Sequence, residues 1–146
     1  MKSEPDAFSI DDLKRRPGKT SHWDGVRNYQ ARNYMSSMKK GDEVLFYHSS
    51  CDEPGVVGIA RVVKEAYPDH TAFDPDDPHF DPKSKPDAPT WFMVDVKFVR
   101  KLRRTLRLAE LKSAPALADF ALVRKGNRLS VQPVTEAQWR AILALE

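Results

Sequence analysis

The segment Trp23–Met35 (WDGVRNYQARNYM) carries many of the side chains in this sequence that could recognise a flat ligand. It places one Trp and two Tyr beside two Arg and three Asn or Gln residues. Aromatic rings stack on nucleobases, and amide and guanidinium groups form hydrogen bonds with base edges. The segment therefore predicts a nucleobase site. The alternative is a buried Trp in a turn, followed by the polar start of a helix.

Other kinds of chemistry have weaker support in the sequence. The spacing of the four histidines matches no metal-binding motif, and a single cysteine, Cys51, does not complete a zinc site. No phosphate-binding loop or dinucleotide fingerprint is present. His48 precedes Ser49, but adjacent strand residues point to opposite faces, so the two make a poor catalytic pair. We therefore expect no metal, no cofactor and no catalysis.

The composition of the 146 residues is that of a globular protein, with 40% hydrophobic and 31% charged residues. Its length fits one domain, which we expect to span 1–146. No apolar run approaches the ~20 residues of a membrane span, and the N-terminus does not have the pattern of a signal peptide. One cysteine suits a reducing compartment. We expect a cytoplasmic monomer that makes no membrane contact.

Charge is unevenly distributed, although the net charge is only +3. Six cations lie in the segment Lys97–Arg107, and six acids lie in Asp69–Asp87. A basic segment could contact phosphates, whereas an acidic loop would be kept away from them. The alternative is that both are solvated stretches that partly neutralise each other.

The sequence predicts short strands and short helices. The expected strands are residues 1–4, 43–49, 56–67, 90–99 and 129–134. The expected helices begin after the capping boxes at Ser9 and Thr135, follow an N-cap at Asn28 to cover 29–38, and cover 108–112 and 116–122. Asp69–Pro89 contains five prolines and is expected to be a long ordered loop, away from any nucleic-acid face.

Residues 90–99 have the clearest strand pattern, and their two faces differ in character. One face is apolar and is expected to be core; it carries Phe92, Val94, Val96 and Phe98. The other face is a candidate cavity lining; it carries Trp91, Met93, Asp95 and Lys97. Trp91 is thus either a core or a pocket residue. The element order favours an α+β protein built on a small, partly closed β-barrel flanked by short helices.

Several longer motifs resemble the EVE domain family and cover nearly the whole chain. They are Lys2–Pro5 (KSEP), Trp23–Arg32 (WDGVRNYQAR), Phe46–Ser49 (FYHS), Ala66–Asp69 (AYPD) and Arg128–Pro133 (RLSVQP). The resemblance implies a PUA-like fold, a β pseudo-barrel flanked by helices, related to the YTH domains that read methylated adenine in RNA.

The same resemblance implies roles for individual residues. Lys2 resembles a phosphate contact, Trp23 resembles one wall of an aromatic cage, and three polar residues resemble the groups around the base: Ser3, Glu4 and Asp24. The family pattern also assigns to the site Gly25, Val26, Arg27, Asn28, Tyr47, His48 and Ser49. We add Trp91 to this predicted set as the aromatic residue of the face that we consider a candidate cavity lining.

The function that these residues imply is non-catalytic binding of a modified nucleobase in nucleic acid, with modified cytosine in DNA as the leading candidate. Binding to RNA stays open. One alternative is a nucleic-acid-processing enzyme similar to the ASCH domains, which would use Lys2, Glu4 or His48. The other is a small-molecule sensor that uses the same pocket.

Overall fold

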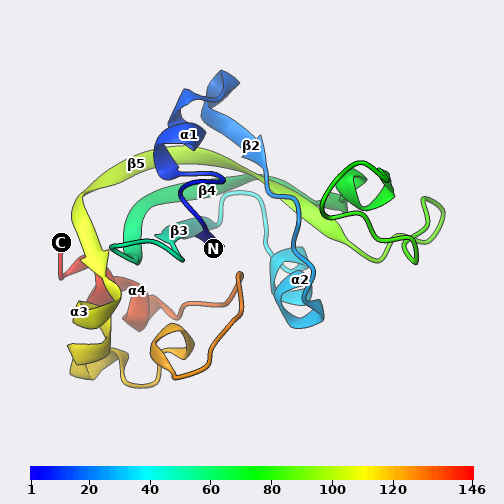
Figure 1. The fold of residues 1–146 in the computed structure, drawn as a ribbon. Coiled ribbons are helices and arrows are strands. Elements are labelled where there is room, and N and C mark those ends of the chain that lie inside the picture. The colour runs from blue at the N-terminus through cyan, green and yellow to red at the C-terminus, as the bar shows by residue number, and fades with distance from the viewer.

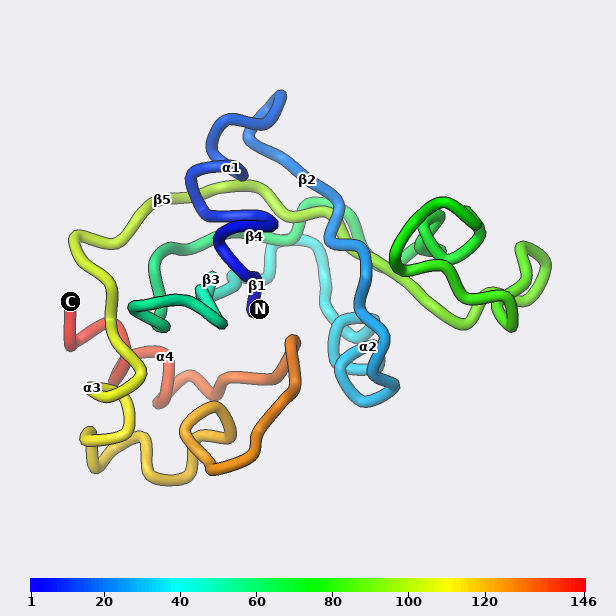
Figure 2. The backbone as a smooth tube through the Cα atoms, viewed as in Figure 1, coloured from blue at the N-terminus to red at the C-terminus, as the bar shows by residue number.

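Five strands form one curved mixed sheet in the computed structural model, which describes residues 1–146 (Figures 1 and 2). In spatial order they are β1 (Lys2–Ser3), β3 (Glu43–His48), β4 (Gly55–Pro68), β5 (Phe92–Arg107) and β2 (Thr20–His22). β1 runs parallel to β3, and the other pairs are antiparallel. The long strands β4 and β5 shift register at several points. Such bulges bend a sheet, which lets this one wrap around a core.

Four short helices flank the sheet, and three of them begin at the caps that the sequence predicts. The helices are α1 (Ile10–Arg15), α2 (Tyr29–Ser36), α3 (Leu108–Ser113) and α4 (Glu136–Leu143). The side chains of Ser9, Asn28 and Thr135 each accept a hydrogen bond from a backbone N–H in the first turn of the helix that follows. None of the helices has the length and apolar character needed to cross a membrane.

The core lies on both faces of the sheet because helices cover each face. Along β3, Val44 and Phe46 belong to one cluster, which also contains buried residues of α1 and α2. The alternate residues Leu45 and Tyr47 belong to a second cluster, which also contains buried residues of α3 and α4. Successive strand side chains point to opposite faces, so a strand covered on both sides is apolar throughout.

β5 confirms the expected core face and extends further than the sequence predicts. Val94 and Val96 are fully buried. On the other face Trp91 and Met93 are only 5% and 3% exposed, whereas Asp95 is half-buried and Lys97 is exposed. The strand continues to Arg107 because Leu102 and Leu106 are buried in the second cluster.

Two predictions near the C-terminus are wrong. Residues 129–134 form no strand, although the Lys2 N–H donates to Ser130 O. The Asn127 side chain instead bonds to Ala121 O, Gln132 Oε1 and the Leu129 N–H, and such local bonds compete with strand pairing. Residues 116–122 form no α-helix; they overlap two short 3-10 helices, Pro115–Leu117 and Ala121–Val123.

The close contact between α1 and β4 predicts that Gly58→Ala will destabilise the protein. A Cβ at Gly58 would lie 2.8 Å from Ile10 Cδ1 and 2.9 Å from Arg100 O. Overpacking of this kind costs ~1–3 kcal/mol. Urea unfolding of Gly58→Ala should show this loss. Adding Ile10→Val, which removes the Cδ1 methyl group, should recover part of it, whereas simple additivity of the two changes would contradict the contact.

Candidate nucleic-acid interface

Pairing of β1 with β3 brings together two groups of predicted site residues that are far apart in the sequence. Lys2 lies opposite Tyr47 and Ser3 opposite His48, while the Ser49 N–H donates to Ser3 O over 3.0 Å. The Lys2 ammonium lies 5.9 Å from the centre of the Tyr47 ring, and burial lowers the pKa of Lys2. Glu4 follows directly and is exposed. A partly buried cation and an exposed carboxylate thus lie two residues apart at the N-terminal strand.

His48 holds the start of α1. Its Nε2 atom accepts a hydrogen bond of 3.1 Å from the Ile10 N–H, which the neutral imidazole can do and the protonated ring cannot. Burial lowers the pKa of His48, which favours that neutral form. The nitrogen that a catalytic base would use is therefore occupied by a backbone donor.

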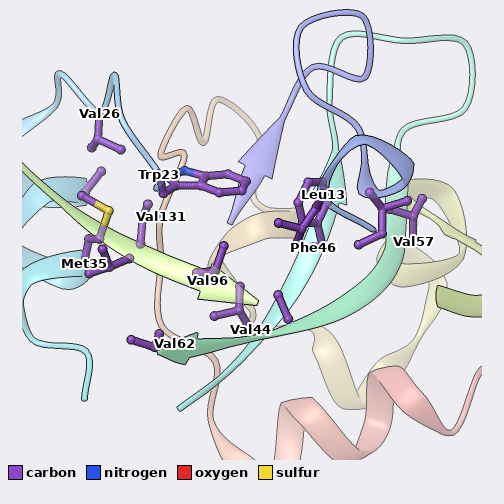
Figure 3. Packing of buried hydrophobic residues seen from close by; sticks show 14 residues of the cluster. Leu13, Trp23, Val26, Met35, Val44, Phe46, Val57, Val62, Val96 and Val131 are labelled. Carbon is purple, nitrogen blue, oxygen red and sulfur yellow. The ribbon is translucent and has the colours of Figure 1, made fainter. Parts of the chain in front are cut away.

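Trp23 is a core residue in this structure, with 7% of its surface exposed. Its ring contacts Phe8 and Phe46 edge to face, with centroid distances of 6.3 and 5.3 Å, and it lies near Val131 (Figure 3). Of the two readings of this segment, the burial of the ring by three neighbours agrees with the buried Trp. Its assignment as a wall of the base site stays a prediction.

Phe8 is a residue of this region that the sequence reasoning missed. Its carbonyl accepts a hydrogen bond of 2.7 Å from Ser3 Oγ, and its ring packs on Trp23. Phe8 therefore links two predicted base-site residues. One signal was available, because an apolar residue just before a helix N-cap commonly packs back onto the helix.

Asp24 places a carboxylate next to Trp23 and close to a histidine. Its Oδ1 lies 3.7 Å from His22 Nε2, and 32% of its side chain is exposed. His22 in turn contacts the His70 ring at a centroid distance of 5.2 Å. No group of His, Cys, Asp and Glu side chains is arranged to hold a metal ion.

The segment after Trp23 is tied to the acidic loop by the buried carboxylate of Asp69. This carboxylate accepts hydrogen bonds from the Gly25 N–H, from Arg27 Nη1, and from both the N–H and the hydroxyl of Thr71. Burial alone would raise the pKa of Asp69, but the hydrogen bonds from Thr71, Gly25 and Arg27 outweigh it and lower the pKa. The carboxylate is therefore charged and fully paired.

Gly25 allows the loop to approach this closely. Its φ is 81°, a left-handed value that favours glycine, and an added Cβ would lie 2.7 Å from the His79 ring. Arg27 also donates to His79 O through both Nε and Nη2. The acidic loop thus lies against the candidate site and beside α2, where it projects from the sheet (Figures 1 and 2).

Trp91, Val26 and Asn28 have structural contacts. The Trp91 Nε1–H donates to Asp81 Oδ2 over 2.7 Å, and its ring packs on Tyr29 at 5.0 Å. Of the two readings of Trp91, the structure favours a buried residue that anchors the loop. Val26 belongs to the first core cluster, and Asn28 caps α2.

The basic segment of β5 is largely neutralised within the protein. Arg100 pairs with Glu146, Lys101 with Asp11, and both Arg104 and Arg107 pair with Glu110. The structure thus favours the reading of this segment as a neutralised surface, although its partners lie outside the acidic loop.

A cavity of about 340 Å³ lies between β3, the end of α2 and the C-terminal segment. Lys2 and Tyr47 are part of its wall, together with Glu43, but Trp23 and Asp24 are not. The lining is mainly apolar and includes Val131, Gln132 and Pro133. A second possible ligand position therefore adjoins the β1 end of the candidate site.

The fold and these motifs define a class of protein. The chain belongs to the EVE domain family, whose family model matches residues 1–145, and its solved relatives have the PUA-like fold.

Among the relatives, the human protein "Thymocyte nuclear protein 1" is 50% identical over 163 aligned residues, which cover 100% of this chain and 72% of the human protein. A crystal structure of a Pseudomonas putida protein matches with a TM-score of 0.96 and 52% identity, covering 99% of this chain and 96% of that one. The structure of human THYN1 protein in complex with 5-methylcytosine-containing DNA matches with a TM-score of 0.95 and 49% identity. The match covers 99% of this chain and 94% of that one.

The His48 contact predicts a pH effect on stability. The folded-state pKa of His48 lies below the ordinary value of 6.5. As the pH falls past that value, the unfolded chain therefore binds more protons than the folded chain, which lowers the stability. The contribution of His48 is complete above about pH 6.5 and is lost as the pH falls toward the folded-state pKa. His48→Gln keeps an acceptor that does not titrate. Urea unfolding between about pH 5 and 8 should show a shallower decline for this variant, and equal slopes would contradict the assignment.

The Asp69 contacts predict a large effect of Asp69→Asn. The change removes the charge that pairs with Arg27 and turns an amide toward donors, so it should cost ~3 kcal/mol or more in urea unfolding. Asp74→Asn is the matched control, because Asp74 lies exposed in the same loop and its oxygen accepts only the local Asp76 N–H. That variant should stay within ~0.5 kcal/mol of the parent. Similar losses in both variants would show that Asp69 has no special role.

Proposed function

We propose that this protein binds DNA that carries a modified cytosine, with 5-methylcytosine as the first ligand to test. The observation that carries this proposal is the match, over 99% of the chain, to a relative whose structure was solved with 5-methylcytosine-containing DNA. At 49% identity and a TM-score of 0.95, the two chains share both the fold and about half of their side chains.

The polar groups near Trp23 suit the edge of cytosine. Cytosine presents an exocyclic amino group as a donor, and Asp or Glu side chains accept from it. Glu4 and Asp24 are the two carboxylates of the predicted set with exposed surface, and Lys2 adds a nearby cation. We propose that the base enters beside Trp23 after leaving its stack, and that these groups read its edge.

The chain is proposed to bind its ligand without changing it. His48, which the enzyme hypothesis would use as a base, accepts a backbone hydrogen bond at Nε2 and is held neutral by burial. Ser49 is tied to β1 through its N–H. These contacts give both residues a place in the packing of β1, β3 and α1 that involves no chemical step.

The proposal is tested by fluorescence anisotropy with labelled duplex DNA that contains either one 5-methylcytosine or one cytosine. We expect the modified duplex to bind about tenfold or more tightly, the discrimination that one methyl group commonly gives. The DNA should be recovered unchanged after incubation. Free 5-methyl-2′-deoxycytidine is added as a competitor, because competition at equal affinity would favour the small-molecule sensor.

Three carboxylate-to-amide variants locate the site. Glu4→Gln and Asp24→Asn should each weaken binding of the modified duplex by roughly tenfold, since a lost base contact costs ~1–3 kcal/mol. Glu43→Gln is the matched control, because Glu43 is exposed and lines the neighbouring cavity. Loss of binding in Glu43→Gln alone would move the site to that cavity. Trp23→Ala is less informative, because removing a buried Trp costs ~3–5 kcal/mol of stability.

A further inference from the structure

We propose that residues 14–19, the exposed end of α1 and its connection to β2, are the surface that contacts the nucleic-acid backbone. This basic turn has the sequence KRRPGK and places four cations within six residues. It forms the uppermost part of the molecule in Figure 1, where β2 leads from it toward Trp23. The inference rests on the proposed function and adds where the phosphates lie.

Three of the four cations have no carboxylate partner. Lys14, Arg16 and Lys19 are exposed and form none of the ion pairs of the structure, whereas Arg15 pairs with Asp12. Most cations of β5, in contrast, are already paired. A cation without an internal partner can neutralise a phosphate and release its counterions without first breaking an ion pair.

Aromatic rings hold the side chains of these cations in place. The ammonium groups of Lys14 and Lys19 both lie within 6 Å of the Phe98 ring centre, at 5.8 and 5.9 Å. Two like charges on one ring repel each other, and a phosphate would relieve that repulsion. The side chains are thus partly ordered before any ligand arrives, which lowers the entropy cost of binding.

The backbone of the turn also favours this role. Gly18 and Lys19 both have positive φ, 63° and 54°. A non-glycine residue in this region is uncommon, and such positions gather at binding sites. Here the conformation reverses the chain between α1 and β2 and brings Lys19 to the Phe98 ring.

Arg16 connects the basic turn to the base site. Its guanidinium lies 5.3 Å from the centre of the Phe8 ring. The Phe8 ring packs on Trp23, and the Phe8 carbonyl accepts a hydrogen bond from the Ser3 hydroxyl. Only Phe8 therefore separates Arg16 from these two predicted base-site residues. A flipped base beside Trp23 would therefore leave its flanking phosphates within reach of Arg16.

The position of the acidic loop also favours phosphate binding at the basic turn. The acidic loop lies beside α2, away from the basic turn in Figure 2. Its carboxylates at Asp74, Asp77 and Asp81 accept hydrogen bonds within the loop or from Trp91, and none of the three forms an ion pair with Lys or Arg. Phosphates would be repelled on that side and attracted on the other.

The test compares two triple variants that lower the net charge equally. The first is Lys14→Gln/Arg16→Gln/Lys19→Gln, and the second is Lys112→Gln/Arg124→Gln/Lys125→Gln, three exposed cations without ion pairs in the C-terminal half. Affinity for both duplexes is measured from about 50 to 200 mM salt. We expect the first triple to lower the salt slope by about 2–3 and the affinity by roughly 10- to 100-fold, and the second to change neither.

The preference for 5-methylcytosine should stay the same in the first triple, because phosphate contacts carry no sequence information. Two results would overturn the inference and leave the proposed function standing. One is an equal salt slope in the two triple variants; the other is a first triple variant that loses binding to the modified duplex but not to the unmodified one. If the first triple variant lowers the salt slope, but the parent protein binds both duplexes equally, the phosphate-contacting surface is supported and the proposed function is overturned.

The variant Lys14→Arg/Lys19→Arg is a control for misfolding of the first triple variant, because it changes two of the same side chains but keeps both charges. It should retain the salt slope of the parent, and a slope that falls in this variant as well would count against a phosphate role.

Discussion

The buried carboxylate of Asp69 is the contact on which the arrangement of the candidate site depends. It accepts four hydrogen bonds and lies at the junction of β4 and the acidic loop. Without it the Gly25 N–H and the Arg27 guanidinium would lose their buried acceptor, and a buried group left unpaired is costly. The direction of the chain after Trp23, and with it the position of Asp24, therefore follows from one carboxylate far along the sequence.

The distribution of charge shows why the net value of +3 says little about binding. The density of cations is high in β5, but folding pairs most of them with Glu146, Asp11 and Glu110. Three cations of the basic turn, Lys14, Arg16 and Lys19, contact aromatic rings instead, which leaves their charge available. Local partners, and not the count of charges, decide which surface attracts a polyanion.

The same aromatic cluster serves the core and adjoins the proposed base site. Phe8 and Phe46 each pack edge to face on Trp23, and the polar groups of Ser3 and Asp24 flank this cluster. Such packing holds the flanking groups in place, because a side chain in a close-packed core has few alternative positions. In this arrangement a close-packed core positions the groups that we propose to contact the base.

The sequence by itself determined the features that depend on near neighbours. The caps at Ser9, Asn28 and Thr135 join residues three positions apart, so pattern alone predicted where three helices begin. Tertiary structure decided the rest. The Gly25–Asp69 hydrogen bond spans 44 residues, the burial of Trp23 needs Phe8 and Phe46, and the local bonds of Asn127 prevent the strand expected at 129–134. Short-range hydrogen bonds are encoded in adjacent residues, whereas burial and long-range pairing exist only after the whole chain has packed.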